Sequence, residues 1–173
     1  MKRLLVVFAV AVICLFPRHR VVAQEASAPP AELKKIGDLV GTWNVVATAY
    51  STDGSAPKKS TLTFKNEWVM GHYFLSMRST YTDGTTGIAY MGYDKDAGVY
   101  TFDEYESTGY ADHSTGKFEG DTWKWTSGKN GDPSHRDRFT MKLVSPTEYS
   151  FKYESLMGAE WKVTMDGVGK KAK

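Results

Sequence analysis

The sequence contains one cysteine, Cys14, which falls inside an apolar run from Leu4 to Phe16. A domain that follows this run has no thiol, so neither a disulfide nor a cysteine-ligated zinc ion can stabilise it. Its stability has to come from buried apolar side chains, for which about 150 residues suffice. With 41% hydrophobic and 13% aromatic residues, the composition excludes a disordered or collagen-like chain.

The sequence also has no hydrophobic run that is long enough to cross a membrane as a helix. Leu4–Phe16 spans 13 residues, whereas a membrane-spanning helix needs about 20. Lys2–Arg3 precede the run, and Val21–Ala23 end in small or aliphatic residues, which is the pattern of a secretory signal. We predict a signal peptide over residues 1–23, cut after Ala23, a secreted or periplasmic protein, and no membrane span after cleavage. Arg18–Arg20 lie unusually close to the cut, so a retained anchor is the alternative.

Excess positive charge disappears with the signal peptide. The full chain has 22 basic and 20 acidic residues, a net charge of +2. Four of the basic residues lie within residues 1–23, which leaves 18 basic against 20 acidic residues. Nucleic acids and anionic membranes attract proteins with an excess of positive charge, which the mature chain lacks. We therefore predict neither as a partner.

Motifs for familiar catalytic and metal chemistry are absent from the sequence. It has no Gly-x-Ser-x-Gly, phosphate-loop, dinucleotide or His-Glu-x-x-His pattern. The histidines beyond the signal, His72, His113 and His135, are not clustered, so we predict no metal site. We predict no cofactor, with haem ligated by His72 or His135 as the remaining possibility.

One short helix precedes the rest of the fold. Residues 24–29 are typical of a flexible tether. Leu33, Ile36 and Leu39 then recur at helical spacing before Gly41, which predicts a helix over Pro30 to Leu39.

Beyond Gly41 there is no helix-length segment, and short β-branched or aromatic stretches alternate with turn sequences such as Thr52-Asp53-Gly54. This pattern predicts ten candidate strands. They are Val45–Tyr50, Thr61–Trp68, Tyr73–Tyr81, Ile88–Tyr93, Val99–Glu106, Tyr110–Phe118, Thr122–Thr126, Arg138–Val144, Tyr149–Ser155 and Trp161–Met165.

Short turns imply antiparallel neighbours, and a sheet that closes on itself has no exposed edge. We therefore predict an all-β fold, an antiparallel up-and-down β-barrel of 8–10 strands with one short N-terminal helix. The barrel domain is expected over residues 30–167, followed by a solvated basic tail over residues 168–173. A two-sheet sandwich is the alternative.

Several short motifs occur in the order of a known family. Gly41-Thr42-Trp43 resembles the Gly-x-Trp signature of lipocalins, in which the tryptophan closes the base of the barrel. Gly71–Leu75, Tyr90–Asp94, Trp123–Trp125 and Arg138 follow. Together they resemble the bacterial lipocalin-like family catalogued as domain of unknown function 1579, over roughly Leu33 to Met165.

This resemblance implies a small barrel, exported or cytosolic, with no established activity. More distantly, strand count and architecture are similar to haem-carrying nitrobindin-type barrels and to fatty-acid-binding proteins. Lipocalins set an arginine from the last strand over the signature tryptophan, whereas the predicted last strand here offers only Lys162. We assign Trp43 and Arg138 to barrel closure. Arg138 is expected to face outward, as a cap or in a surface ion pair.

Strand alternation predicts which side chains face the barrel interior. Many of the inward residues are large aromatics, which suit a small hydrophobic or amphipathic ligand. Trp161, Val163 and Met165 are also expected inside. The predicted ligand-binding residues are Tyr100, Phe102, Glu104, Trp123, Trp125, His135, Phe139, Phe151 and Tyr153.

Two alternatives to ligand binding remain. The aromatic rings could fill a solid barrel that acts as an interaction module in the envelope. The protein could also be an enzyme that uses His135 with Asp137, or Glu104 with Glu106, as acid and base. If Val99, Thr101, Asp103 and Tyr105 instead face inward, both glutamates face water.

Overall fold

The computed structural model describes residues 28–128 and 136–173. The predicted signal peptide, most of the tether and His135 lie outside these residues. The described chain consists of a short helix, α1 (Leu33–Ile36), continued by a 3₁₀ turn, η1 (Gly37–Leu39), a second 3₁₀ turn, η2 (Met70–His72), and ten strands. The strands are β1 (Gly41–Ala49), β2 (Lys58–Val69), β3 (Phe74–Tyr81), β4 (Thr86–Asp94), β5 (Val99–Glu106), β6 (Ala111–Glu119), β7 (Thr122–Gly128), β8 (Arg136–Ser145), β9 (Glu148–Met157) and β10 (Glu160–Lys171).

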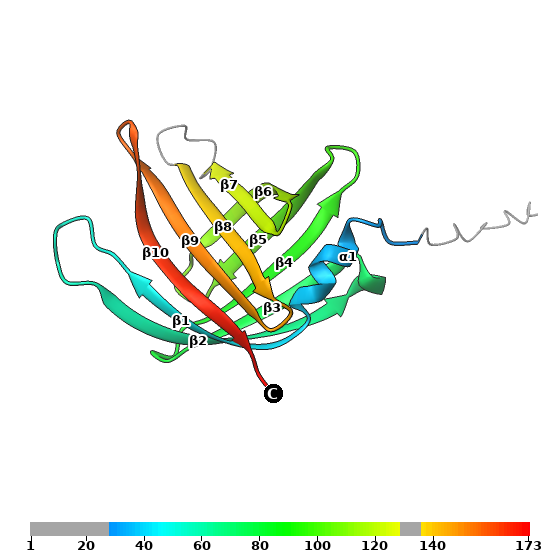
Figure 1. Ribbon diagram of the computed structural model, residues 1–173, viewed down its shortest axis with the longest axis horizontal. Helices are drawn as coiled ribbons and strands as arrows, with labels where there is room; N and C mark the ends of the chain where they lie inside the picture. Colours follow the sequence, from blue (N-terminus) through cyan, green and yellow to red (C-terminus); the bar gives the residue numbers. More distant parts are fainter. Residues whose placement is uncertain (1–27, 129–135) are drawn as a thin grey trace, which may run out of the picture.

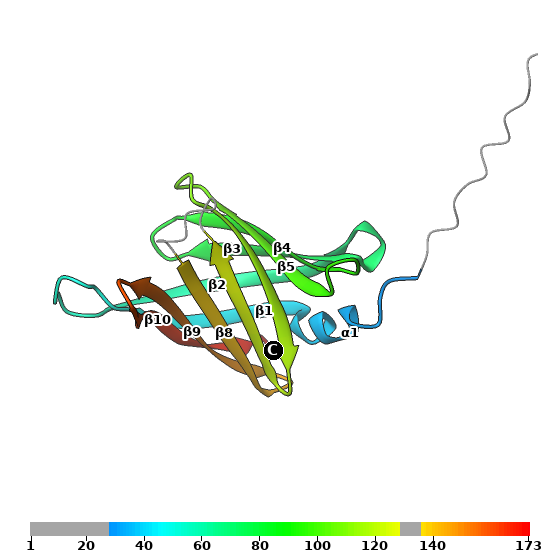
Figure 2. The ribbon, with the colours of Figure 1, turned by 90° about the horizontal axis from the view of Figure 1, so that it is seen from above.

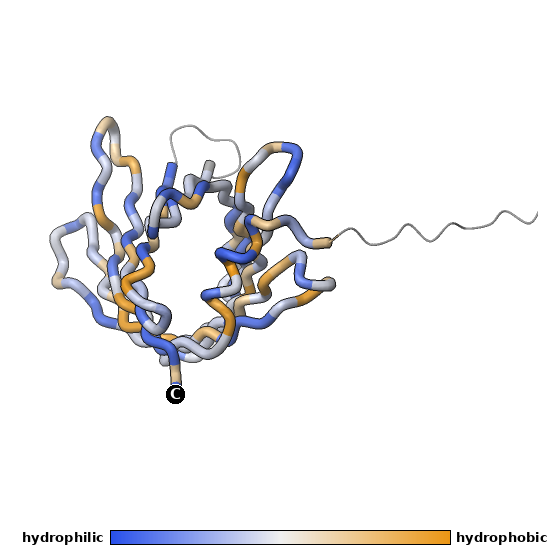
Figure 3. The backbone as a smooth tube through the Cα atoms, turned by 45° about the vertical axis from the view of Figure 1, so that its right-hand side comes forward, coloured by the Kyte–Doolittle hydropathy of each residue, from blue (hydrophilic) through white to orange (hydrophobic). Residues whose placement is uncertain are grey.

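The ten strands form a closed antiparallel barrel (Figures 1 and 2). Each strand pairs with its neighbours in the sequence, and β1 pairs with β10 from Trp43↔Lys171 to Ala49↔Met165. The ring of strands is visible in the tube view (Figure 3). The predicted up-and-down barrel with one short helix is confirmed, at the upper end of the expected strand number.

Alternating strand direction gives the barrel two different ends. We call the end that carries α1 and the start of β1 the base. We call the other end, where the turns at 50–57, 82–85, 107–110 and 158–159 lie, the mouth. Along β5, β7 and β9 the chain runs from base to mouth, so a higher residue number on these strands lies nearer the mouth.

The helix covers the base of the barrel. Leu33, Ile36 and Leu39, the residues whose spacing predicts the helix, are 3%, 0% and 1% exposed. The turn begins with hydrogen bonds such as Leu33 N–H to the Pro30 carbonyl, 3.1 Å. The helix proper is shorter than predicted because its last turn tightens into η1.

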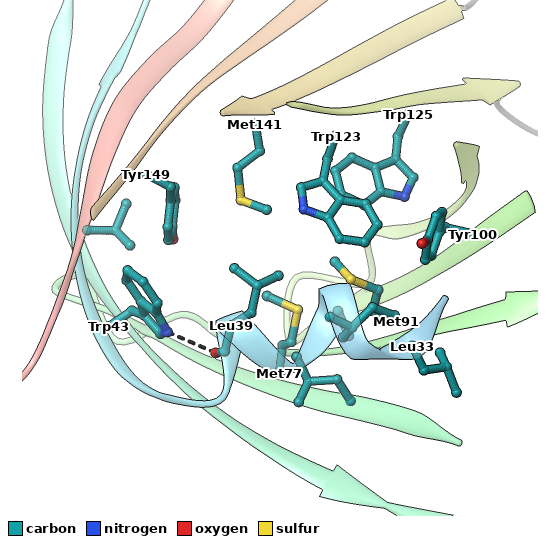
Figure 4. Packing of buried hydrophobic residues seen from close by; sticks show 14 of the residues in the cluster. Leu33, Leu39, Trp43, Met77, Met91, Tyr100, Trp123, Trp125, Met141 and Tyr149 are labelled. Atoms are coloured by element: carbon teal, nitrogen blue, oxygen red, sulfur yellow. Dashed lines mark hydrogen bonds between the residues drawn. The ribbon is translucent and has the colours of Figure 1, made fainter. Parts of the chain in front are cut away.

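Trp43 is the centre of the base. Its ring is 1% exposed, and its Nε1–H donates to the Leu39 carbonyl at 2.8 Å (Figure 4). The same carbonyl accepts a hydrogen bond from Asn66 Nδ2 at 2.9 Å. The Lys171 ammonium lies 5.4 Å from the centre of the indole ring, a cation–π distance.

The glycine of the Gly-x-Trp motif has a physical explanation in this arrangement. Gly41 has φ +117°, and a Cβ there would lie 2.9 Å from Lys171 Cε. A side chain would therefore be strained and would displace the lysine.

Strand β10 runs to Lys171, so two expectations about this end of the barrel are wrong. Residues 168–171 belong to the barrel rather than to a solvated tail. The last strand also offers a basic residue other than Lys162, because it includes Lys171, whose ammonium lies over the Trp43 ring. Gly167 and Gly169 lower the β propensity of this segment, which is why the sequence alone suggests a tail.

A register shift between Val163 and Met165 divides β10 into two halves. Such a bulge exchanges the inward and outward faces of a strand. Met165 pairs with Tyr153 and faces inward, whereas Val163 pairs with Glu154 and is 38% exposed. The predicted inward position of Trp161 and Val163 is therefore wrong.

Candidate functional site

The barrel encloses a cavity of about 140 Å³. Its walls come from β1 to β9, and most of its lining atoms are apolar. A void of this size accommodates an aromatic ring of about the size of benzene. The lining residues are Val45, Leu62, Phe64, Met77, Met91, Phe102, Glu104, Asp112, Ser114, Trp125, Phe139, Met141, Tyr149, Phe151 and Tyr153.

Six of the residues predicted to bind a ligand lie in this lining, on β5, β7, β8 and β9, which are four of the five consecutive strands from β5 to β9. They are Phe102, Glu104, Trp125, Phe139, Phe151 and Tyr153. His135 lies outside the described residues.

Tyr100 and Trp123 face inward as predicted, but they belong to the base rather than to the cavity. Trp123 is fully buried, and the ring centres of the two residues are 4.5 Å apart (Figure 4). The Tyr100 hydroxyl donates to the Glu32 carbonyl at 3.1 Å. The hydrogen bond ties Tyr100 to the segment that leads into α1, Trp123 packs against Tyr100, and neither side chain lines the cavity.

Arg138 does not close the barrel. It lies on the outer face of β8, because Phe139 beside it lines the cavity. Its Nε and Nη2 donate to the Glu154 carboxylate at 2.7 Å and 2.9 Å, and its guanidinium carbon lies 4.4 Å from the centre of the Trp161 ring. The outward orientation and surface ion pair expected for Arg138 are present, at a distance from Trp43.

Glycines of one strand leave room for the rings of the next. A Cβ at Gly167 would lie 2.6 Å from the Phe151 ring, and one at Gly116 would lie 2.7 Å from the Trp125 ring. These rings therefore lie across neighbouring backbone instead of filling the centre of the barrel. This packing leaves the interior partly open.

Two carboxylates lie at the end of the cavity that is nearer the mouth. Glu104 on β5 and Asp112 on β6 are directly opposite each other in the register, and both line the cavity. The Ser114 hydroxyl donates to Asp112 Oδ2 at 2.6 Å. Glu104 has no hydrogen bond or ion pair with any described residue.

Burial raises the pKa of Glu104 to about 7, with smaller contributions from the negative charges of Glu106 and Asp112. A carboxyl with this pKa is partly protonated at neutral pH. Its environment therefore favours the neutral form or a nearby positive charge.

The second glutamate of the predicted acid–base pair has a different environment. Glu106 Oε1 accepts a hydrogen bond from the Tyr81 hydroxyl at 3.1 Å, and its Oε2 accepts one from Thr108 at 3.2 Å. Tyr105, between the glutamates, is 51% exposed, so the alternative register with Tyr105 inward is wrong. Glu104 lies directly opposite Asp112 on the adjacent strand β6. The carboxylate pair that lines the cavity is therefore Glu104 with Asp112, not Glu104 with Glu106.

The inward face of β7 carries three buried polar atoms without a hydrogen-bond partner in the described part of the chain. They are the Nε1 atoms of Trp123 and Trp125 and the Oγ atom of Ser127. The three residues are 0%, 3% and 2% exposed. Since buried polar groups are normally paired, this strip leaves donors and an acceptor unused beside the cavity.

Sequence reasoning missed Asp112 and Ser114. Both are polar and lie on a face with Gly116, a composition that is typical of an outward face. The signal that could have found them is pairing: once Glu104 faces inward, its partner across β6 must do so too.

The described cavity lining contains no imidazole, and His135, one of the two histidines considered as haem ligands, lies outside the described residues. His72 is exposed, and its ring packs edge-on against Trp68 with centres 5.7 Å apart. His113 pairs with Asp103 outside the barrel, on the face opposite to Glu104. No group of three or more histidine, cysteine, aspartate or glutamate residues with metal-site geometry occurs in residues 28–128 and 136–173.

Comparisons with known proteins support the fold. No family model matches the sequence, and no curated protein matches it. Among solved structures, the barrel is similar to that of Rv2717c from M. tuberculosis, with a TM-score of 0.64, 13% identity, and coverage of 84% of this chain and 99% of that one.

A protein of unknown function from the DUF3598 family of Nostoc punctiforme has a TM-score of 0.57 and 13% identity. The match covers 79% of this chain and 49% of that one, so the chain spans about half of this relative. At these identities the likeness shows a shared fold. Among the described helices, none has the length and apolarity needed to cross a membrane.

Proposed function

We propose that this chain is an exported protein that binds one small hydrophobic or amphipathic molecule inside the barrel. The observation that carries the proposal is the cavity of about 140 Å³, whose walls are apolar and aromatic except for Glu104, Asp112 and Ser114 at one end. A pocket with apolar walls and a few convergent polar groups is the usual form of a small-molecule site.

The cavity favours binding over the alternative of a solid barrel. The six predicted lining residues surround open space, and glycines opposite the rings of Phe151 and Trp125 keep that space from being filled. Trp125, which lines the cavity, has a ring nitrogen without a hydrogen-bond partner among the described residues.

A cavity-filling variant tests the proposal. Toluene binding is measured by isothermal titration calorimetry for the wild-type protein, for Ser114→Phe and for Thr115→Phe. Ser114 lines the cavity, and Thr115 is the exposed residue beside it on β6. We expect toluene to bind the wild-type protein and Thr115→Phe and not Ser114→Phe. Equal binding by both variants, or no binding to any protein, would contradict the proposal.

Export has its own test. The apolar run Leu4–Phe16 and the cut after Ala23 predict a mature protein that begins at Gln24. N-terminal sequencing of the protein purified from the envelope or medium of its own cells measures this directly. A protein that still begins at Met1 would indicate a retained anchor.

A further inference from the structure

The geometry points to a small organic cation as the ligand: an amine with a single aromatic ring or a branched alkyl body, whose ammonium group binds between Glu104 and Asp112. This inference rests on the proposed binding function and specifies its ligand. It follows from the charge, the hydrogen-bonding capacity and the size of the cavity.

The two carboxylates define the charge that the site prefers. Glu104 and Asp112 are directly opposite on adjacent strands, and like charges at such positions destabilise a sheet. The described cavity lining contains no lysine, arginine or histidine to neutralise them. Arg138 and Lys152 are paired with Glu154 on the outer face of the barrel. A bound cation would supply the missing positive charge.

An independent observation on β7 is an unpaired polar group beside the two carboxylates. The Ser127 side chain is 2% exposed, and its hydroxyl is unpaired among the described residues. It lies on the same face as Trp125, which lines the cavity, and it pairs across the sheet with Ser114. Ser114 in turn donates to Asp112. Glu104, Asp112, Ser114 and Ser127 therefore lie together, and we call this group the polar corner. Ser127 lies behind the lining residues rather than among them, and its hydroxyl is a further unpaired acceptor at the border of this corner.

The walls next to this corner suit the rest of such a ligand. The rings of Phe102 and Trp125 lie with centres 6.1 Å apart, and aromatic faces attract ammonium groups. Phe139 and Phe151, with ring centres 5.8 Å apart, follow deeper in the lining. An apolar body that extends from the ammonium toward these rings is buried without leaving an unpaired polar atom.

The volume limits the ligand to a compact molecule. About 140 Å³ corresponds to one benzene-sized group, so a long acyl chain does not fit. A ligand with a carboxylate head would also meet Glu104 and Asp112 with the same sign of charge. The site therefore discriminates against fatty acids both by size and by charge.

Three ligands of similar shape test the charge preference. Calorimetry at pH 8 compares 2-phenylethylamine, 2-phenylethanol and 3-phenylpropionate on the wild-type protein. We expect the amine to bind at least about tenfold more tightly than the alcohol, and 3-phenylpropionate to bind most weakly. An alcohol that binds as tightly as the amine would overturn the inference while leaving the proposed function intact. Failure of all three ligands, together with failure of toluene, would overturn both.

Matched variants assign the effect to residues. Glu104→Gln and Asp112→Asn should each weaken binding of the amine about tenfold and leave binding of the alcohol unchanged. Asp103→Asn alters the neighbouring carboxylate on the outer face of β5 and should change neither. If either cavity variant binds the amine as tightly as the wild-type protein does, its carboxylate does not hold the ammonium. An equal loss for amine and alcohol would mean that the variant damages the cavity rather than the charge.

Discussion

The two ends of this barrel use their buried polar groups differently, although Trp123 Nε1 at the base also lacks a partner among the described residues. At the base, Trp43 and Tyr100 donate to backbone carbonyls of the segment that carries α1. Toward the mouth, the Ser127 hydroxyl has no partner among the described residues, and burial raises the pKa of the Glu104 carboxyl. Satisfied polar groups in a packed core stabilise a fold, whereas unsatisfied ones destabilise it. The base therefore holds the barrel together, and the polar corner near the mouth is where a ligand can bind.

The largest effect is expected at the base. Trp43→Ala removes a fully buried ring that contacts Tyr149, with ring centres 5.0 Å apart, and leaves the Leu39 carbonyl with one hydrogen bond fewer. We expect the free energy of unfolding to fall by about 3–5 kcal/mol in urea denaturation. Trp43→Phe keeps an aromatic ring, so it should lower the free energy of unfolding by less. A loss below about 1 kcal/mol for the alanine variant would show that the base is not the stabilising end.

A change near the mouth should act in the opposite direction. The pKa of Glu104 is about 7 in the folded protein, against 4.5 for an unperturbed glutamate. Between these values the folded protein binds more protons than the unfolded chain, so the free energy of unfolding falls as the pH rises and levels off above pH 7. The difference between the two pKa values corresponds to about 3 kcal/mol.

Replacing the Glu104 carboxyl removes the loss of folding stability that its ionisation causes. We expect Glu104→Gln to be more stable than the wild-type protein by about 1–3 kcal/mol at pH 8 and equally stable at pH 4. Four other ionisable side chains act on Glu104 or are acted on by it, namely Glu106, Asp112, Tyr81 and Tyr110. They remain in both proteins, so the difference in urea denaturation from pH 4 to pH 8 measures Glu104 together with its coupling to Glu106 and Asp112. A constant difference at all pH values would contradict the assignment.

A smaller effect is expected where a glycine makes room for a ring. A Cβ at Gly169 would lie 2.2 Å from the Tyr149 ring, so Gly169→Ala should destabilise the protein by about 1–3 kcal/mol. Gly37 provides the control, because a Cβ there would make an ordinary contact of 3.8 Å with Trp68. Gly37→Ala should be neutral or slightly stabilising. Equal melting temperatures for the two variants would show that the ring moves freely.

The smallest effect is expected on the outer face. Arg138→Ala removes a bidentate ion pair with Glu154, but the arginine side chain is 40% exposed and Lys152 also contacts this carboxylate. We expect a loss of about 1 kcal/mol or less and unchanged binding of 2-phenylethylamine by calorimetry. A tenfold change in binding would place Arg138 in the site after all.

Much of the barrel could be predicted from local pattern. Strand β5 has the predicted bounds Val99–Glu106, because alternating residues between turn sequences define a strand by themselves. Alternation also identified the inward rings. It gives the face of a strand but not the height along the barrel axis, so it could not separate Trp123 at the base from Trp125 in the cavity.

The errors lie where a residue depends on distant neighbours. The bulge between Val163 and Met165 has no local signature, and it reverses the faces of Trp161 and Val163. The sequence places Lys171 in a tail because Gly167 and Gly169 before it are poor strand formers. These glycines are needed because they lie against the rings of Phe151 and Tyr149 on β9, which the local sequence does not reveal. Asp112 becomes recognisable as a site residue only through its pairing with Glu104.

The seam between β1 and β10 sets the order in which this protein can fold. Every other strand pairing joins neighbours in the sequence, whereas Trp43 pairs with Lys171 at almost the opposite end of the chain. Local hairpins can form early, but the seam has to wait for the ends of a long meander to meet, and non-local closure of this kind slows folding. The cation–π contact of Lys171 with Trp43 therefore forms in the last step of folding, in which β1 pairs with β10 and the sheet closes into a barrel.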